Sequence, residues 1–288
     1  MRNIRFATAD VFTSVPFGGN QLAVIPDARG ISDDEMLSIA REFNYAETTF
    51  VLPPENPAHT RRVRIFTPAF EMPFAGHPTI GTAFLLVSEG RVAATLVQTS
   101  AAGDVPVQVD LEGARATMLQ LPPEFGEPIA DRTAVAAGAG LQPGDLVADL
   151  PVVAVSTGIP HVMVPVRDEP TLRRAQRDAT ACHAICEAAE AESLYLFAVR
   201  GDGDVMARMF DRYVAIGEDP ATGSAAGPLG AYLSVHALAG MPGRAVVAQG
   251  EMVGRPSFLS LEVSPQDATW SVRVSGGVYL MGEGTFTF

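Results

Sequence analysis

The chain has 288 residues, of which 47% are hydrophobic and 18% charged, so it can fill two domain cores and does not resemble a disordered chain. Its formal net charge of −13 would repel a nucleic acid or an anionic membrane surface, so we expect neither as a partner. All 20 basic residues are arginines, which excludes a pyridoxal phosphate enzyme and a Walker A loop, because both need a lysine.

The N-terminal part of the chain predicts strands around one surface helix and one buried helix. Strands are expected where apolar residues alternate or run together, over 4–12, 21–26, 47–53 and 61–67. The segment 32–44 is amphipathic, and Ser32 and Glu35 have the spacing of a capping box. The segment 78–87 is apolar on nearly all sides, which predicts a buried helix.

The same order of segments recurs in the second half. The matched pairs are GNQLAVI (19–25) with GIPHVMV (158–164), AETTFVL (46–52) with AESLYLF (191–197), RVRIF (62–66) with VMARMF (205–210), and GHPTIG (76–81) with TGSAAG (222–227). The last three pairs have nearly constant offsets, and the shorter offset of the first pair predicts a longer helix over 169–190. Two copies indicate a duplicated domain rather than an array of short repeats.

We therefore predict an α+β fold with two pseudo-symmetric halves, each a curled, mostly antiparallel sheet or barrel around a central buried helix. The strands expected over 270–275 and 277–288 have no counterpart after the first copy. We expect the C-terminus to cross back and complete the first sheet. The predicted N-terminal domain comprises 1–118 plus 276–288, and the C-terminal domain comprises 119–275.

The repeat places two matched segments at the starts of the two buried helices. Gly76 and His77 begin one helix, and Thr222, Gly223 and Ser224 begin the other. Backbone N–H groups and the helix dipole favour an anion at such a start, and glycine allows a ligand close to the backbone. If pseudo-symmetry brings both starts together, they form one pocket suited to a small carboxylate. The structural alternative is two ordinary capped helices.

Two carboxylates and one histidine are candidates for proton chemistry. Glu47 opens a strand among apolar neighbours, where desolvation would raise its pKa toward the range of a general acid/base. Asp219 precedes a helix and could orient a substrate or share a proton with His77. The structural alternatives are a surface glutamate, matched by Glu192 in the second copy, and a capping aspartate.

The cysteines and the other histidines carry no clear chemistry. Cys182 and Cys186 are four apart in an Ala-rich helical stretch, a poor disulfide or zinc pattern even with His183 nearby, so we expect packing residues and no metal site. We interpret the histidines other than His77 as packing or surface residues. The N-terminus lacks the apolar run of a signal peptide and no segment is long enough to span a membrane, so we expect a cytoplasmic protein.

Several of these segments together resemble the PhzF-like family of phenazine biosynthesis. The resembling blocks are DVFTSVPFGGNQLAVI (10–25), REFNYAETTFVL (41–52), RIFTPAFEMPFAGHPTIGTA (64–83), EDPATGSAAG (218–227), GEMVGRPS (250–257) and VSGGVYLMGEG (274–284). They span nearly the whole chain in order. The resemblance implies the diaminopimelate epimerase fold, with the site in a cleft between two halves, a homodimer and no cofactor.

The resemblance also implies roles for individual residues. Glu47 would shuttle a proton between two carbons of the substrate, with His77 and Asp219 binding or assisting. The residues expected to bind the substrate are Asn20, Gly76, Thr222, Gly223 and Ser224. The best-supported function is therefore a cofactor-independent isomerase acting in biosynthesis on a small carboxylate.

Departures from the family pattern leave the substrate open. Ala46 stands where the family often has serine, and Gln21 stands where it often has proline. The epimerases of this fold use a cysteine at each helix start, which this chain lacks at both. One alternative is a racemase or epimerase that uses Glu47 and Asp219 from opposite faces. Another is a non-catalytic small-molecule-binding homologue.

Overall fold

The computed structural model describes residues 1–200, 203–213 and 217–288, which fold into two compact units. The first unit comprises Met1–Leu119 and Ser275–Phe288, and the second comprises Gln120–Val274. Among the described residues, no helix is long and apolar enough to cross a membrane.

The first unit is a closed barrel with one helix inside it. Its elements are β1 (Asn3–Val11), β2 (Asn20–Ile25), α1 (Asp33–Phe43), β3 (Glu47–Leu52), β4 (Arg61–Phe66), β5 (Glu71–Met72), α2 (Gly76–Ser88), β6 (Thr95–Ser100), β7 (Gly103–Asp110), β8 (Arg115–Leu119) and the C-terminal part of β17 (Thr269–Thr287). Hydrogen-bonded neighbours follow the ring β1–β2–β3–β4–β6–β7–β8–β17–β1. The pairs β2–β3 and β4–β6 are parallel, whereas β1–β17, β1–β2, β3–β4, β6–β7 and β7–β8 are antiparallel, so the barrel is mostly antiparallel.

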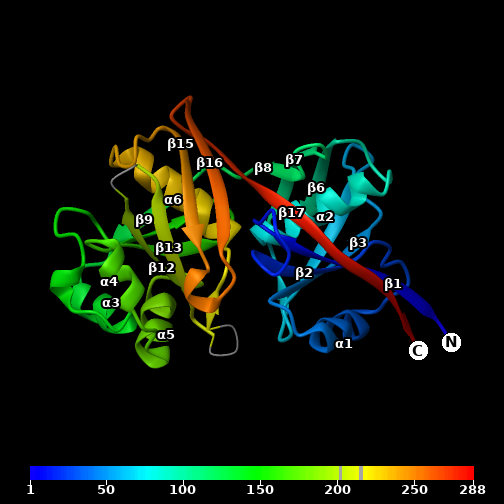
Figure 1. The fold of residues 1–288 in the computed structure, drawn as a ribbon, viewed down its shortest axis with the longest axis horizontal. Helices are drawn as coiled ribbons and strands as arrows, with labels where there is room; N and C mark the ends of the chain where they lie inside the picture. The colour runs from blue at the N-terminus through cyan, green and yellow to red at the C-terminus, as the bar shows by residue number, and fades with distance from the viewer. Residues whose placement is uncertain (201–202, 214–216) are drawn as a thin grey trace. The chain divides into compact units, whose positions relative to one another are not determined.

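Sequence explains which helix lies inside. From Gly76 to Val87, every residue of α2 is buried, as its uniformly apolar character predicts. A Cβ atom at Gly81 would come within 2.5 Å of the Leu22 side chain, so glycine allows the helix and β2 to approach closely. The outer helix α1 begins with the predicted capping box of Ser32 and Glu35. Because α1 and α2 cover opposite faces of β3, both faces of that strand are buried (Figure 1).

The second unit repeats this order around a second buried helix. Its elements are β9 (Glu124–Pro128), α3 (Arg132–Gly138), η1 (Pro143–Asp145), β10 (Val153–Ser156), β11 (Pro160–Pro165), α4 (Glu169–Arg174), α5 (Ala179–Ala188), β12 (Ser193–Val199), β13 (Val205–Asp211), β14 (Glu218–Asp219), α6 (Gly223–Val235), β15 (Gly243–Gln249), η2 (Glu251–Val253), β16 (Ser257–Gln266) and the N-terminal part of β17. Strand neighbours run β9–β10–β11–β12–β13–β15–β16. Helix α6 packs on β10, β11, β15 and β16, as α2 packs inside the first barrel.

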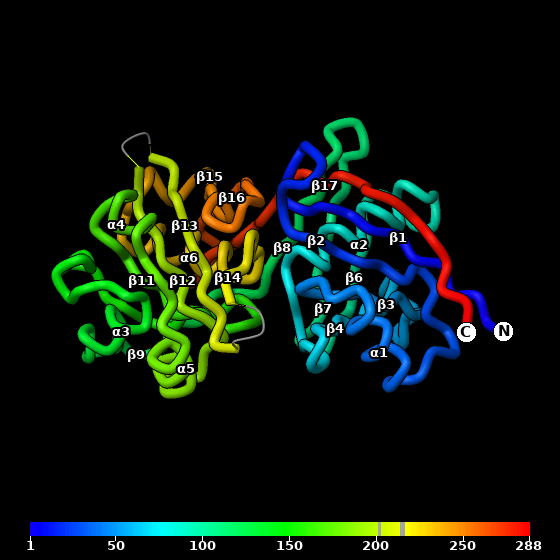
Figure 2. The backbone as a smooth tube through the Cα atoms, turned by 60° about the horizontal axis from the view of Figure 1, so that its bottom comes forward, coloured from blue at the N-terminus to red at the C-terminus, as the bar shows by residue number. Residues whose placement is uncertain are grey.

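The C-terminal strand pairs with the first strand, as the sequence predicts. Asn3 lies opposite Thr287, so the two termini are side by side (Figure 2). The expectation of two separate strands is wrong, because β17 is continuous from Thr269 to Thr287. The C-terminal part of β17 also has a counterpart after the first copy. This counterpart is β9, which follows the strands of the first unit along the chain and pairs with β10 of the second unit, as the end of β17 pairs with β1.

The single long helix expected over 169–190 is also wrong. The structure has two shorter helices, α4 and α5, and α4 ends at Arg174. The Asp178 side chain accepts hydrogen bonds from the backbone N–H groups of Thr180 and Ala181, so it begins a new helix. An aspartate inside an amphipathic pattern can therefore mark a second helix start.

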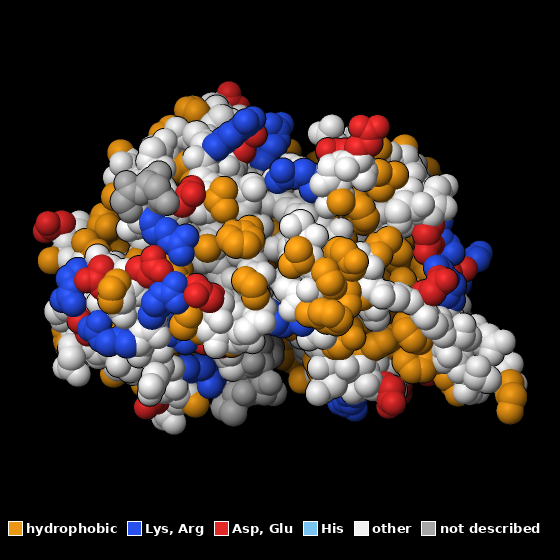
Figure 3. Space-filling model, viewed as in Figure 1, with side chains coloured by type: hydrophobic (Ala, Val, Ile, Leu, Met, Phe, Trp, Pro, Cys, Tyr) orange, Lys and Arg blue, Asp and Glu red, His pale blue; other side chains and the backbone are white. Residues whose placement is uncertain are grey.

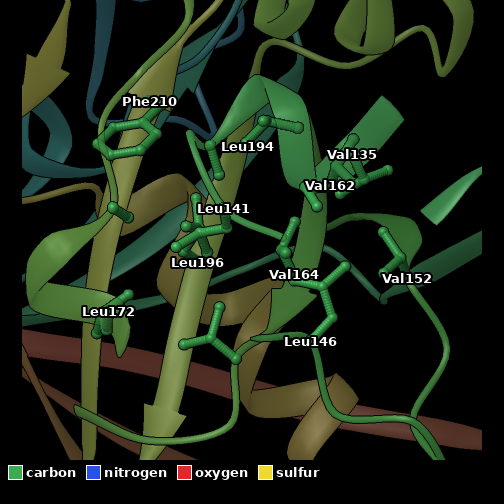
Figure 4. Close-up of a cluster of buried hydrophobic side chains, with 14 of the residues drawn as sticks. Val135, Leu141, Leu146, Val152, Val162, Val164, Leu172, Leu194, Leu196 and Phe210 are labelled. Carbon is green, nitrogen blue, oxygen red and sulfur yellow. The ribbon is translucent and has the colours of Figure 1, made fainter. Parts of the chain in front are cut away.

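A large apolar core lies under the outer helices of the second unit. Buried side chains of β11 and β12, including Val162, Val164, Leu194 and Leu196, pack with residues of the segments that contain α3 and α4 (Figure 4). Both cysteines, Cys182 and Cys186, are free and buried in this cluster, so the prediction that they are packing residues is confirmed.

The surface over α4 and its neighbours carries both signs of charge. Figure 3 shows acidic and basic side chains interspersed on this part of the second unit. Arg173, for example, pairs with Glu169 and Glu251. Exposed pairs of this kind contribute little to stability.

The two units also share a local side-chain arrangement. In the first, Arg64 forms an ion pair with Glu71 and its guanidinium lies over the Phe66 ring. In the second, Arg208 makes the same contacts with Glu218 and Phe210. This recurrence fixes which positions of the two units correspond.

Candidate active site

In the first unit, Glu47 and His77 lie in direct contact. Glu47 begins β3 and His77 is the second residue of α2, so a strand end and a helix start hold the pair. The distance from His77 Nε2 to Glu47 Oε2 is 3.2 Å, and the Glu47 side chain is only 13% exposed. This low exposure disfavours the alternative of an ordinary surface glutamate.

The hydrogen bonds of His77 indicate its protonation state. Its Nε2 atom also lies 3.3 Å from the Gln21 carbonyl oxygen, which can only accept a hydrogen bond. Nε2 therefore carries the proton and donates it to the Gln21 carbonyl oxygen, while Glu47 Oε2 lies close by without forming a hydrogen bond to it. Burial lowers the pKa of His77 to about 3, against a smaller opposing effect of the Gln21 carbonyl, so the ring is neutral at pH 7.

The start of α2 lacks a side-chain cap. Ala75 occupies the N-cap and supplies no side-chain hydrogen bond.

Asn20, at the start of β2, is buried, and Leu22 on the same strand pairs with Glu47. Because alternate residues of a strand share a face, Asn20 and Leu22 lie on one face of β2. The sequence-predicted residues Asn20, Glu47, Gly76 and His77 thus all belong to this part of the first unit.

In the second unit, Asp219 belongs to a buried hydrogen-bond chain. Thr222 donates its hydroxyl proton to Asp219 Oδ2 over 2.5 Å. The Gln249 amide donates to the Thr222 hydroxyl and the Asp219 carbonyl, and its oxygen accepts from the Tyr195 hydroxyl. Since each polar atom constrains the next, the chain fixes the Asp219 carboxylate. Sequence reasoning missed Gln249 and Tyr195, because both lie far from the motif along the chain.

The start of α6 resembles that of α2 and adds a histidine. Thr222 is the N-cap residue and makes no side-chain cap bond to the helix. In contrast, α1, α3, α4 and α5 all begin with a side-chain cap. Ser224, the second residue of α6, lies 3.2 Å from His161 Nε2, a buried histidine that the sequence suggested was a packing or surface residue.

Strand register corrects the match between Glu47 and Glu192. Thr48 pairs with Phe66, and Leu194 pairs with Phe210. Because Phe66 and Phe210 correspond, the residue before Leu194, which is Ser193, takes the position of Glu47 in the second unit. Only the first unit has a carboxylate there.

The described residues contain no group of three or more His, Cys, Asp or Glu side chains that could hold a metal ion. In the first unit, the Glu47 carboxylate lies next to the Nε2–H group of a neutral His77. In the second unit, the Asp219 carboxylate and the Ser224 hydroxyl both lie at the start of α6, which has no side-chain cap.

The chain is similar to known proteins over nearly its whole length. The profile of the phenazine biosynthesis-like protein family matches residues 9–284. An uncharacterized isomerase of Mesorhizobium japonicum is 36% identical over 99% of both chains. The trans-2,3-dihydro-3-hydroxyanthranilate isomerase of Pseudomonas aeruginosa is 32% identical over 97% of this chain and 98% of its own length.

Solved structures give the same result for the fold. A PhzF-family protein from Bacillus anthracis superposes with a TM-score of 0.88 at 28% identity, covering all of both chains. A probable proline racemase from Agrobacterium radiobacter, 12% identical, has a TM-score of 0.70 and covers 99% of this chain and 93% of its own, which shows likeness of fold alone. The predicted diaminopimelate epimerase-like α+β fold is confirmed, and the chain belongs to the phenazine biosynthesis-like family as an isomerase of the PhzF type.

Proposed function

We propose that this isomerase moves a proton within a small carboxylate substrate and that Glu47 is its acid/base. The observation that carries the proposal is the Glu47 carboxylate, whose side chain is 13% exposed and whose buried Oε2 atom lies 3.2 Å from Nε2 of a neutral His77. A relative named for its action on trans-2,3-dihydro-3-hydroxyanthranilate, a cyclic amino acid, supports a carboxylate as substrate.

The two residues would divide the chemistry between them. Glu47 takes a proton from one carbon of the substrate, and the electron pair left behind shifts into the adjacent π system. The protonated Glu47 then returns the proton to a second carbon, so atoms and charge balance over the cycle. His77, which stays neutral, lies against the carboxylate and takes no proton itself.

A single base suits this arrangement. The corresponding position in the second unit holds Ser193, which has no carboxylate to serve as a second base. The racemase alternative would need Asp219 instead, whose carboxylate belongs to the hydrogen-bond chain that organises the start of α6. We therefore assign Asp219 to binding or assistance.

We propose that Asn20, Gly76, Gly223 and Ser224 contact the substrate. The two glycines allow a carboxylate oxygen close to backbone N–H groups at helix starts, where the helix dipole favours a negative charge. Thr222 uses its hydroxyl proton on Asp219 and its backbone N–H on the Gln249 oxygen. Its contribution is therefore indirect, through the position of Asp219.

The two departures from the family pattern have different consequences. His77 contacts the backbone carbonyl of Gln21, a group that proline also has, so this substitution leaves the bond intact. Ala46 precedes Glu47 and lacks the hydroxyl that serine would supply. We propose that any difference in substrate arises at position 46 rather than at position 21.

Proton NMR in D₂O tests the function. The protein is incubated with trans-2,3-dihydro-3-hydroxyanthranilate and with small cyclic carboxylates and amino acids that bind it in calorimetry. The proposal predicts that a C–H signal disappears at one carbon and that a new C–H or C–D centre forms at another. Inversion at one labelled centre supports the epimerase, and bound compounds that stay unchanged support a binding homologue.

Assembly and location are also part of the proposal. We expect a homodimer in the cytoplasm, acting in a biosynthetic process, and sedimentation equilibrium measures the mass in solution.

A further inference from the structure

The second unit contains a buried serine–histidine–serine chain outside the proposed acid/base pair. His161 on β11 lies with its Nδ1 atom 2.8 Å from the Ser193 hydroxyl and its Nε2 atom 3.2 Å from the Ser224 hydroxyl. Ser193 is fully buried, His161 is 2% exposed and Ser224 is 7% exposed. All three belong to the second unit, so the chain does not depend on how the units are placed.

Ser224 and His161 are arranged like a serine nucleophile and its base, but their surroundings do not support that chemistry. Burial lowers the pKa of His161 to about 3, so the ring is a weak base at neutral pH. The third member is a hydroxyl, which cannot stabilise an imidazolium as a buried carboxylate does. Ser224 is therefore not activated for covalent catalysis.

The complete burial of the Ser193 hydroxyl favours one tautomer of His161 over the other. In the described structure, the Ser193 hydroxyl has His161 Nδ1 as its hydrogen-bond partner. If Nδ1 carried the ring proton, the buried Ser193 hydroxyl hydrogen would lack an acceptor among the described residues, which is costly. If Nε2 carries it, Ser193 donates to Nδ1 and Nε2–H donates to Ser224 Oγ. The hydroxyl hydrogen of Ser224, at the helix start, is then directed away from His161.

We propose that His161 is a positioning residue that makes Ser224 a hydrogen-bond donor to a carboxylate oxygen of the substrate. The chain runs from Ser193 through His161 to Ser224, and each member donates to the next. The inference rests on the proposed binding of a small carboxylate at the start of α6. It adds two residues, Ser193 and His161, that act on substrate affinity without touching substrate.

Histidine-selective ¹⁵N NMR of the full-length protein tests the tautomer without any ligand. Assignment compares wild type with His161→Gln. We expect one neutral form with the proton on Nε2 from pH 5 to 8, and loss of this fixed tautomer in Ser193→Ala. A wild-type ring protonated on Nδ1, or a cationic ring at pH 7, would overturn the proposal.

A double-mutant cycle tests the action through Ser224. Calorimetry with 2-aminobenzoate, an aromatic carboxylate without a proton to transfer, measures binding alone. A hydrogen bond to a charged group is worth about 1.5–3 kcal/mol, so Ser224→Ala should weaken binding roughly 10- to 100-fold. Ser193→Ala should weaken it several-fold in wild type and have almost no effect in the Ser224→Ala background.

Equal effects of Ser193→Ala in both backgrounds would show a general structural role and refute the proposal. Absence of 2-aminobenzoate binding to wild type would refute the proposed carboxylate site. The NMR measurement would still test the tautomer of His161 separately. With substrate, a positioning role predicts a raised KM in Ser193→Ala with kcat nearly unchanged. A lower kcat at unchanged KM would contradict it.

Discussion

Replacement of Glu47 by glutamine removes the proposed acid/base while it keeps the shape of the side chain. The introduced glutamine can keep the contact with His77, whose Nε2 atom lies 3.2 Å from Glu47 Oε2 in wild type. The exchange of a charged for a neutral acceptor should change the free energy of unfolding by only about 1 kcal/mol. An amide cannot take a carbon-bound proton, so we expect turnover to fall by about 10³, within the range for general acid–base catalysis.

The assay compares Glu47→Gln with Glu192→Gln under identical conditions. Glu192 is the acidic residue nearest to the equivalent sequence position, and its side chain is 30% exposed and paired with Arg212. Its replacement should leave turnover within about threefold of wild type. Product formation is followed by NMR, and urea unfolding checks that both variants are folded. Wild-type turnover in a folded Glu47→Gln protein would refute the assignment.

Four further predictions follow from particular contacts. His77→Asn should lower turnover about 10- to 100-fold, because the Glu47 carboxylate loses its polar contact with His77 Nε2, and unchanged steady-state rates would contradict this. Thr222→Val should destabilise the fold by about 1–3 kcal/mol in urea and weaken activity, because Asp219 and Gln249 lose their shared partner. Gly81→Ala should destabilise by about 1–3 kcal/mol through overpacking, and an unchanged melting temperature would contradict the close approach. The pKa of buried His161 is about 3 in the folded protein, whereas the ordinary value is 6.5, so between these pH values only the unfolded chain binds a proton at this residue. The free energy of unfolding should therefore fall as the pH falls through this range, by up to about 1.4 kcal/mol per pH unit. Unfolding of His161→Gln, measured across the same pH range, should show a slope smaller by that amount.

The elements of the first barrel could be predicted because local pattern and burial agree. The uniformly apolar segment after His77 became the inner helix, and the capped amphipathic segment after Ser32 became the outer one. The return of the C-terminal strand to β1 was predicted from a C-terminal segment that had no evident match in the sequence, although β9 proves to be its structural counterpart. The break between α4 and α5 was not, since an aspartate such as Asp178 fits both a helix surface and an N-cap.

The candidate site shows the same division between local and long-range information. Glu47 and His77 were found from motifs, and their contact follows from the folding of a strand against a helix start. Hydrogen-bonded partners remote in sequence, such as His161 and Gln249, carry no local signal. The pairing of Ser193 with Asp211 depends on the register of the two strands. The near-constant sequence offset predicts that register only to within one residue, so it could not distinguish Ser193 from Glu192 as the match for Glu47.

A crystal structure of the protein with bound 2-aminobenzoate tests the central claim most directly. We predict that a Glu47 carboxylate oxygen lies within about 3.5 Å of a ring carbon of the ligand, the distance at which proton transfer becomes possible. The ligand carboxylate should contact backbone N–H groups at a helix start that contains Gly76 or Gly223. A ligand held at either start with Glu47 far from every carbon would contradict the account.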